Sequence, residues 1–183
     1  MSKPSPQHPD LAANPTLTER EAFDAWQRHV DAGRIGKRAA PDPARLARFD
    51  AKGRHVSGDK PTKEMPLHAA FYETRGTAGA VVHLHSTHSV ALSMLPETDP
   101  ENMLPPLTAY SIMRLGKVKL LPYYRPGDPA MGDAVRGLAG KRAAVVLANH
   151  GPVVAARDLE AAVYAMEELE ETAKLALLLR GAN

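Results

Sequence analysis

The chain has 183 residues, of which 44% are hydrophobic and 24% charged, and its formal net charge is +2. This length suits one domain with a substantial core, and the dispersed charge, without a basic stripe rich in aromatic residues, argues against nucleic-acid binding. The absence of cysteine excludes disulfides and thiolate metal ligands. No apolar run is long enough to span a membrane, and the N-terminus lacks the apolar core of a signal peptide, so we expect no membrane segment and a cytoplasmic location.

The first 41 residues differ in composition from the rest. Residues 1–16 are rich in Pro, Ser, Asn and charge, which predicts a mobile tail. Thr16 to Glu19 resembles a capping box, and Phe23, Trp26 and Val30 fall on one helical stripe. We therefore expect residues 1–41 to be an atypical, partly disordered segment with one helix, followed by a domain over residues 42–183.

Local signals mark the next elements. Asp42-Pro43 predicts a short turn, and Lys52-Gly53 predicts a turn into a short strand. Thr62 is placed to cap a helix that runs to about Arg75 and stops at Gly76.

Strands and helices alternate through the remainder of the chain. The prolines at 96, 100, 105 and 106 predict a long irregular crossing in its middle. The predicted elements are a strand over 79–82, a helix from Ser86 or Thr87 to Leu95, a strand over 118–121, a helix over 128–138, a strand over 143–148 and a long helix capped by Asp158. This alternation predicts an α/β fold with helices on both faces of the sheet.

Three histidines stand at the ends of apolar strand-like runs. His83 and His85 follow the first run, and His150 follows the run over 144–147. Residues two apart on a strand share a face, and a third imidazole from another strand end can complete a site for one divalent metal. Hydrogen-bonded core histidines are the alternative, and the pattern alone leaves both open.

The other histidines have weaker claims to a metal. His68 lies within a predicted helix and His88 lies past the strand end, so we expect both to be structural or to donate a ring proton to a neighbour. We expect the remaining three to lie on the surface: His8, His29 and His55.

Carboxylates add a second constraint. Glu64 stands at the start of the helix before the His83 strand, where a tight return of the chain brings its side chain towards the metal as proton shuttle or fourth ligand. Compensation of the helix macrodipole is the simpler interpretation. Four further glutamates are expected to form a solvated helix face: Glu167, Glu168, Glu170 and Glu171.

Several separated motifs, in order, resemble the class II aldolase/adducin family, with the closest likeness to its 3-oxo-tetronate 4-phosphate decarboxylase branch. The resemblance covers roughly residues 42 to 181. The motifs are Lys60-Pro-Thr-Lys-Glu64, His68, Ala80-Val-Val-His-Leu-His-Ser-Thr-His88, Leu121-Pro-Tyr-Tyr-Arg-Pro-Gly-Asp128 and Ala148-Asn-His-Gly-Pro152.

The resemblance implies a three-layer α/β/α sandwich, assembled as a homotetramer. It implies that His83, His85 and His150 bind Zn²⁺ or another divalent ion such as Mn²⁺ or Co²⁺, and that Glu64 is both the proton-transfer residue and a metal neighbour. The implied reaction is decarboxylation of a small phosphorylated sugar acid, a 3-oxo-tetronate 4-phosphate, to dihydroxyacetone phosphate through a metal-stabilised enediolate. A class II sugar-phosphate aldolase would use the same site and release an aldehyde instead.

One departure from the family pattern keeps further alternatives open. Family members carry a Gly-Asn-x-Ser segment and a Thr-Gly or Ser-Ser-rich loop that grip the substrate phosphate, and neither is found in residues 1–41. A non-catalytic, adducin-like relative therefore remains an alternative to the lyase. An unrelated metal hydrolase is a third alternative, although an amidohydrolase barrel needs a longer chain and a cupin would lack the long C-terminal helix.

Overall fold

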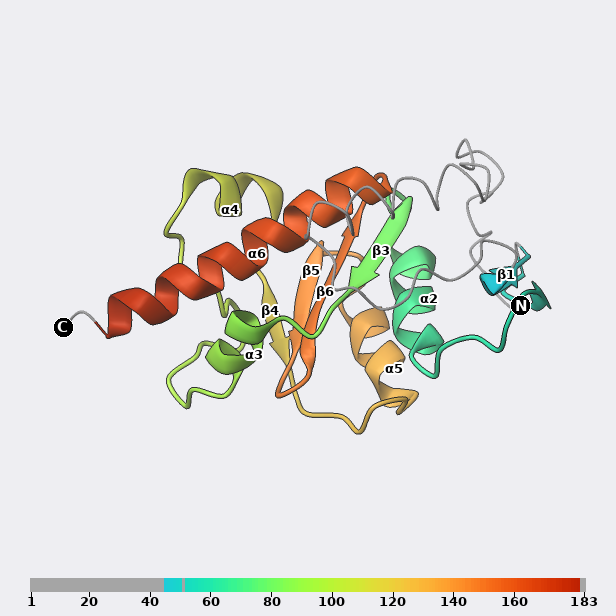
Figure 1. Ribbon diagram of the computed structural model, residues 1–183, viewed down its shortest axis with the longest axis horizontal. Coiled ribbons are helices and arrows are strands. Elements are labelled where there is room, and N and C mark those ends of the chain that lie inside the picture. Colours follow the sequence, from blue (N-terminus) through green and yellow to red (C-terminus); the bar gives the residue numbers. More distant parts are fainter. Residues whose placement is uncertain (1–44, 51, 182–183) are drawn as a thin grey trace, which may run out of the picture.

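The computed structural model describes residues 45–50 and 52–181 (Figure 1). The expected mobile tail, the capping box at Thr16, the Trp26 helix and the Asp42-Pro43 turn all lie outside the described residues. The described part contains a four-stranded sheet covered by helices and a separate two-stranded sheet.

The central sheet is mixed. Its strands are β3 (Ala80–His83), β4 (Lys119–Leu121), β5 (Ala144–Leu147) and β6 (Gly151–Ala156), in the spatial order β3-β6-β5-β4. β6 is antiparallel to both of its neighbours, whereas β4 runs parallel to β5. All four residues of β5 are buried, which explains why its sequence is continuously apolar rather than alternating.

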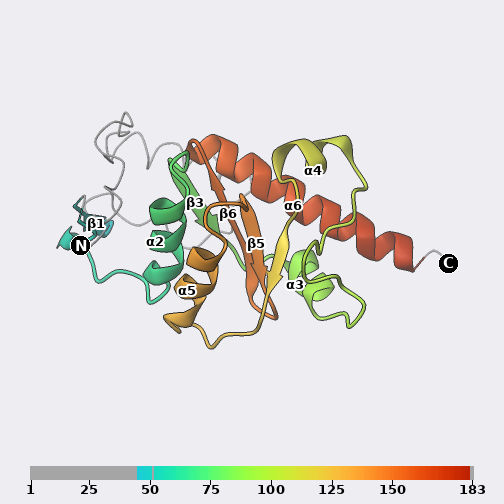
Figure 2. The same ribbon diagram turned by 180° about the vertical axis from the view of Figure 1, so that it is seen from behind.

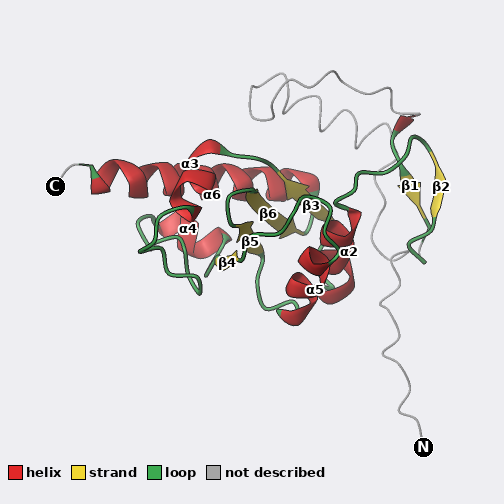
Figure 3. Cartoon of the chain, turned by 90° about the horizontal axis from the view of Figure 1, so that it is seen from below, coloured by secondary structure: helices red, strands yellow, loops and turns green. Residues whose placement is uncertain are grey.

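Helices cover both faces of this sheet, as the sequence predicts. α2 (Met65–Thr74) and α5 (Ala130–Gly137) pack on one face (Figure 2), and α3 (Thr87–Ser93) and α6 (Leu159–Arg180) pack on the other. α4 (Ala109–Arg114) packs against α6. Figure 3 shows α6 along one side of the sheet, with α2 and α5 on the other. The expected α/β/α sandwich is thus confirmed. None of the described helices has the length and apolarity needed to cross a membrane.

Each face has its own apolar core. Leu67 and Phe71 of α2 meet Met131 of α5 on one face, while Leu92 of α3 and Leu169 of α6 are fully buried on the other. Complete burial of side chains of this size contributes about 1.5–3 kcal/mol each. Successive side chains of β3 point to opposite faces of the sheet. Val82 therefore lies in the core under α6, whereas Val81 and His83 face the side of the sheet that α2 covers. This alternation directs His83 towards the start of α2.

The two-stranded sheet confirms the turn predicted at Lys52-Gly53. β1 (Arg48–Phe49) pairs with β2 (His55–Ser57), and Gly53 adopts a positive φ of 72° in the turn between them. Glycine adopts this conformation without steric cost.

Several helix boundaries differ from the prediction, and α5 begins at Ala130 rather than at Asp128. α2 begins at Met65, and Thr62 caps the turn before it, its Oγ1 accepting a hydrogen bond from the Glu64 N–H at 3.3 Å. Pro66 stands in the first helical turn, where its missing N–H leaves no helix bond unmade. α3 ends at Ser93 rather than Leu95.

Three elements are absent from the sequence-based prediction: β1, where the sequence predicts only a turn, β6 and α4. β6 forms a hairpin with β5 although it contains Pro152, a residue that usually disfavours strand assignment. α4 lies within the expected irregular crossing, where Thr108 caps it by accepting from the Ser111 N–H at 3.0 Å. The four prolines before it favour irregular structure, so the sequence pattern does not predict this short helix.

The expectation of a solvated glutamate face on α6 is wrong for two of the four residues. Glu168 accepts a hydrogen bond from the Thr108 hydroxyl at 2.7 Å, and Glu170 binds the start of α3. Both carboxylates reach neighbouring elements that are far away in sequence, so the local pattern could not reveal these contacts.

Candidate metal centre

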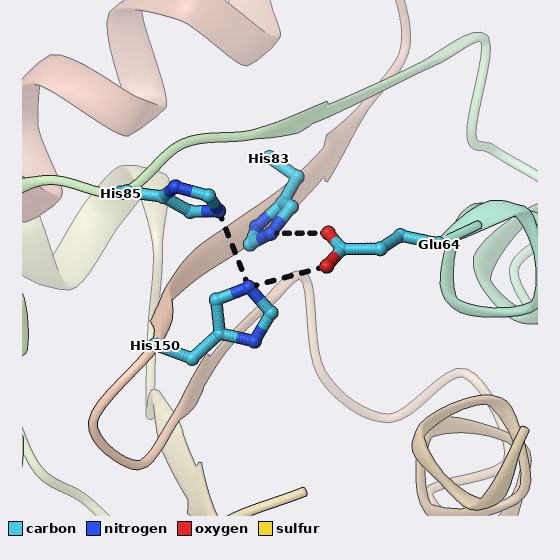
Figure 4. Close-up of side chains that lie close together, drawn as sticks. All are labelled: Glu64, His83, His85 and His150. Atoms are coloured by element: carbon cyan, nitrogen blue, oxygen red, sulfur yellow. Dashed lines mark hydrogen bonds and ion pairs between the residues drawn. The ribbon is translucent and has the colours of Figure 1, made fainter. Parts of the chain in front are cut away.

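Four potential metal ligands converge at one end of the central sheet (Figure 4). Glu64 comes from the residue before α2, His83 from the last position of β3, His85 from the loop after β3 and His150 from the turn between β5 and β6. One ligand atom from each residue lies within 4.8 Å of the others. The three histidines and the glutamate proposed from sequence are therefore brought together.

The orientation of His83 is set by a backbone carbonyl. Its Nδ1–H donates to the Pro152 carbonyl oxygen at 2.9 Å, because that oxygen can only accept. In the neutral ring, Nε2 then carries a lone pair, and it lies 2.9 Å from Oε2 of Glu64 without making a hydrogen bond. Two electron-rich atoms at this separation repel each other unless a cation or a proton lies between them.

The distances among the donors fit a divalent ion. Nε2 of His150 lies 3.2 Å from Nε2 of His85 and 3.3 Å from Oε1 of Glu64. Ligands about 2.0–2.1 Å from a tetrahedral zinc ion are themselves separated by about 3.3 Å. The donor set of three imidazoles and one carboxylate, with a buried and orphaned Nε2, therefore fits a zinc-like cation.

A tight turn brings His150 to the other histidines. Asn149 adopts a positive φ of 59°, and the His150 N–H donates to the Leu147 carbonyl at 3.1 Å. The following residue, Gly151, lies against the chain that leads from β3 to His85. A Cβ atom on Gly151 would stand 2.1 Å from the Leu84 carbonyl oxygen, so only glycine allows the two histidine-bearing loops to approach this closely.

Electrostatics favour the neutral form of two imidazoles, those of His83 and His150. Burial lowers the pKa of His83, and this effect outweighs the Pro152 carbonyl and Glu64, which raise it. Burial likewise lowers the pKa of His150, against the attraction of Glu64 and with the repulsion of the other two rings. Neutral imidazole is the form that coordinates metal, so these histidines need not lose a proton to bind one at neutral pH.

The two remaining candidate histidines have different roles. His68 lies edge-on to His83, with ring centroids 6.4 Å apart, and burial, with a smaller effect of the neighbouring His83, lowers its pKa to about 4. His88 faces Glu170, with Nδ1 placed 2.9 Å from Oε1, which confirms the expected donation of a ring proton to a neighbour. His55 is exposed in β2, as expected, and His8 and His29 lie outside the described residues.

Sequence reasoning missed two groups that shape the centre. The Pro152 carbonyl orients His83, and the Glu170 carboxylate holds the helix that follows His85. No pattern in the sequence signals the first, since any residue has a carbonyl. The second joins residues 82 positions apart.

Comparisons with known proteins agree with this geometry. The family described as Class II Aldolase and Adducin N-terminal domain matches residues 37–177. The 3-oxo-tetronate 4-phosphate decarboxylase of Escherichia coli (strain K12) is 51% identical over 138 residues, which cover 75% of this chain and 65% of that protein. The L-fuculose phosphate aldolase of the same strain is 32% identical over 131 residues, covering 70% of this chain and 58% of that protein. The chain thus spans just under two thirds of the decarboxylase.

Solved structures share the fold. YgbL from Escherichia coli superposes with a TM-score of 0.80 at 39% identity, covering 88% of each chain. YgbL from Klebsiella pneumoniae gives a TM-score of 0.80 at 35% identity, covering 90% of this chain and 92% of that one. These structures extend the likeness from sequence motifs to the arrangement of the α/β/α layers.

Proposed function

The chain belongs to the class II aldolase and adducin family, and we propose that it is a metal-dependent carbon–carbon lyase that decarboxylates a 3-oxo-tetronate 4-phosphate to dihydroxyacetone phosphate. The observation that carries the proposal is the convergence of Glu64, His83, His85 and His150 on one point. The substrate follows from the decarboxylase that is 51% identical over the matched segment. Because that segment covers 65% of the relative, the whole reaction is proposed by similarity.

The three imidazoles and Glu64 would hold the metal, for which we propose Zn²⁺. A divalent cation in this position supplies positive charge to the carbonyl oxygen of the bound 3-oxo acid. His83 is fixed for this role by its bond to Pro152, and His150 by the turn that carries it. The Nδ1 atom of His150 is buried without a hydrogen-bond partner among the described residues, whereas its Nε2 atom faces His85 and Glu64.

Glu64 would transfer the proton that the reaction requires. Loss of carbon dioxide leaves an electron pair that flows into the neighbouring carbonyl, and the carbon that carried the carboxylate then needs one proton. The Glu64 carboxyl group reaches both His83 and His150, and its side chain is only 10% exposed. A carboxyl group screened from solvent and fixed at the reacting centre is suited to deliver that proton.

Aldol cleavage of a sugar phosphate is the second candidate, favoured by the 32% identity with the fuculose phosphate aldolase. The same polarised carbonyl would accept the electron pair, but the leaving fragment would be an aldehyde. A product assay that separates carbon dioxide release from aldehyde release distinguishes the two reactions. A chain that binds metal but releases neither product would instead match a non-catalytic, adducin-like relative.

The role of Glu64 is tested by Glu64→Gln. The amide keeps the size of the side chain but cannot accept or deliver the proton, so we expect metal to remain largely bound while turnover falls by about 10²–10⁴-fold. Glu73→Gln is the matched control, since Glu73 lies in α2, the helix that Glu64 precedes, in an exposed ion pair with Arg136. Turnover of Glu64→Gln equal to that of the control would remove Glu64 from the proton-transfer role.

The remaining features are proposed on the resemblance. We expect a homotetramer, a cytoplasmic location and a role in carbohydrate metabolism. We also propose a division into a segment of residues 1–41 and a family domain of residues 42–183, supported by a family match that begins at residue 37. Light scattering tests the assembly, cell fractionation tests the location and limited proteolysis tests the boundary.

A further inference from the structure

Helix α3 connects the two loops that carry His85 and His150. It begins at Thr87, two residues after His85, and ends at Ser93. Ser93 meets the turn between β5 and β6, where its hydroxyl accepts the Asn149 N–H at 3.1 Å. Since Asn149 immediately precedes His150, one seven-residue helix touches both histidine-bearing loops.

The start of α3 is held by a carboxylate from α6. Glu170 accepts the His88 N–H at 2.7 Å through Oε1 and the Ser89 N–H at 2.9 Å through Oε2. The His88 ring adds a third contact, with Nδ1 placed 2.9 Å from Oε1. Ser86, which occupies the N-cap position, makes no capping bond with its side chain. Glu170 therefore binds N–H groups that the local sequence leaves free.

Glu170 is suited to hold this position as an anion. Its side chain is 22% exposed. Burial alone would raise the pKa of the Glu170 carboxyl, but the His88 and Ser89 donors outweigh burial and hold it below its usual range. Hydrogen bonds from N–H groups to a charged carboxylate are about twice as strong as neutral ones. The contact therefore anchors α3 to α6, which lies across the core.

The end of α3 is held by a buried hydroxyl. Ser93 is 7% exposed, and its Oγ donates to the Val90 carbonyl at 2.6 Å while it accepts from Asn149. The donated bond fixes the direction of the hydroxyl, so its lone pairs face the turn. Asn149 is held by this bond in its left-handed conformation, with a φ of 59°.

We propose that Glu170 and Ser93 are positioning residues, which hold His85 and His150 at the spacing that a metal requires by fixing the two ends of α3. The inference rests on the proposed metal site. Neither residue belongs to the group of four donors, so each acts through the loop that it anchors. Outer contacts of this kind typically change metal affinity by 10–100-fold when removed.

The test is Co²⁺ binding to the full chain, followed by the visible spectrum of the ion and by competition with a chelator. We expect Glu170→Ala to bind Co²⁺ about tenfold more weakly and to shift the visible bands, because the ring of His85 is no longer held in place. Glu171→Ala is the matched control, since Glu171 is the next residue of α6 and its ion pair within residues 52–181 is a surface contact of 3.8 Å with Lys174. Glu170→Gln keeps one acceptor oxygen and should fall between the control and Glu170→Ala.

Ser93→Ala tests the other end of the helix, with Ser57→Ala in the exposed strand β2 as its control. We expect Ser93→Ala to weaken Co²⁺ binding by several-fold to about tenfold, since Asn149 loses the acceptor of its N–H. Thermal melting of each metal-free variant shows that it is folded. If Glu170→Ala does not fold, Glu170→Gln carries the test of that end.

The possible outcomes separate this inference from the proposed function. Wild-type protein that binds one Co²⁺, with affinity and spectrum unchanged in folded Glu170→Ala and Ser93→Ala, overturns the positioning role but leaves the metal site intact. Wild-type protein that binds no Co²⁺ overturns the metal site, and the positioning role with it. Weaker binding and shifted bands in both variants, with both controls unchanged, support the inference.

Discussion

Two neighbouring ligands of the centre stand on different supports: His83 lies in the sheet, and His85 lies in a loop. His83 is the last residue of β3, its side chain is only 7% exposed, and a backbone carbonyl fixes its ring. His85 lies beyond the strand, is exposed, and precedes a helix whose start is held by Glu170. The comparison shows that neighbouring ligands of one motif can derive their rigidity from different sources. For His83 the source is the strand ladder, and for His85 it is a remote carboxylate.

The largest difference between the two ligands should appear when each histidine is removed. His83→Ala takes away a fixed ligand and leaves Glu64 buried without it, so we expect metal affinity to fall by more than about 100-fold, beyond the effect of outer contacts. His85→Ala removes a ligand whose loop must be ordered on binding, so its loss should be smaller. Isothermal titration of Zn²⁺ into both variants measures the difference. A larger loss in His85→Ala would reverse the comparison.

The close approach of the two histidine-bearing loops can be broken at Gly151. A Cβ atom in Gly151→Ala would lie 2.1 Å from the Leu84 carbonyl and force the loops apart. We expect the free energy of unfolding to fall by about 1–3 kcal/mol, accompanied by weaker metal binding. Urea unfolding measures the first effect and Zn²⁺ titration the second.

Gly137→Ala is the control for that substitution. Gly137 lies in α5, where a Cβ atom would have no neighbour within 4 Å, so alanine should stabilise the helix by about 0.5–1 kcal/mol. Equal effects of the two substitutions would mean that the Leu84 contact does not constrain the loops.

A smaller effect than that of Gly151→Ala is expected at the Glu170 carboxylate, which holds the start of α3. The pKa of the Glu170 carboxyl is lowered in the folded chain, so folding favours its ionised form and the resulting stability is present above the ordinary carboxyl pKa of 4.5. As pH falls through the lower folded pKa, this contribution is lost. We expect Glu170→Gln to be about 1–2 kcal/mol less stable than wild type at pH 7.

Below the ordinary carboxyl range, the stabilities of wild type and Glu170→Gln should converge. Urea unfolding at a series of pH values measures the convergence, with Glu171→Gln as the control on the exposed side of α6. If the difference in unfolding free energy between wild type and Glu170→Gln stays constant down to the lowest pH at which the chain folds, the charge of Glu170 does not stabilise α3.

The sequence predicts the ligands better than it predicts their support. His83 and His85 are recognisable because a strand of period two ends in a pair of histidines, and His150 because it follows a second apolar run. Glu64 is a candidate from its place before the His83 strand, and the resemblance gives it and the three histidines their roles. β6 is missed because Pro152 lies within it, and α4 is missed because prolines precede it. The hydrogen bonds from His88 and Ser89 to Glu170 depend on how α6 packs against α3. These bonds join residues far apart in the chain and leave no local pattern.

Zinc analysis combined with X-ray absorption on the zinc-loaded protein tests the central claim most directly. Three imidazole nitrogens and one carboxylate oxygen predict one Zn²⁺ per chain, with ligands at about 2.0–2.1 Å, and a triple substitution of His83, His85 and His150 by alanine should abolish binding. A wild-type chain without stoichiometric zinc, or a triple variant that binds it as well as wild type, would contradict the assignment of a metal to this cluster.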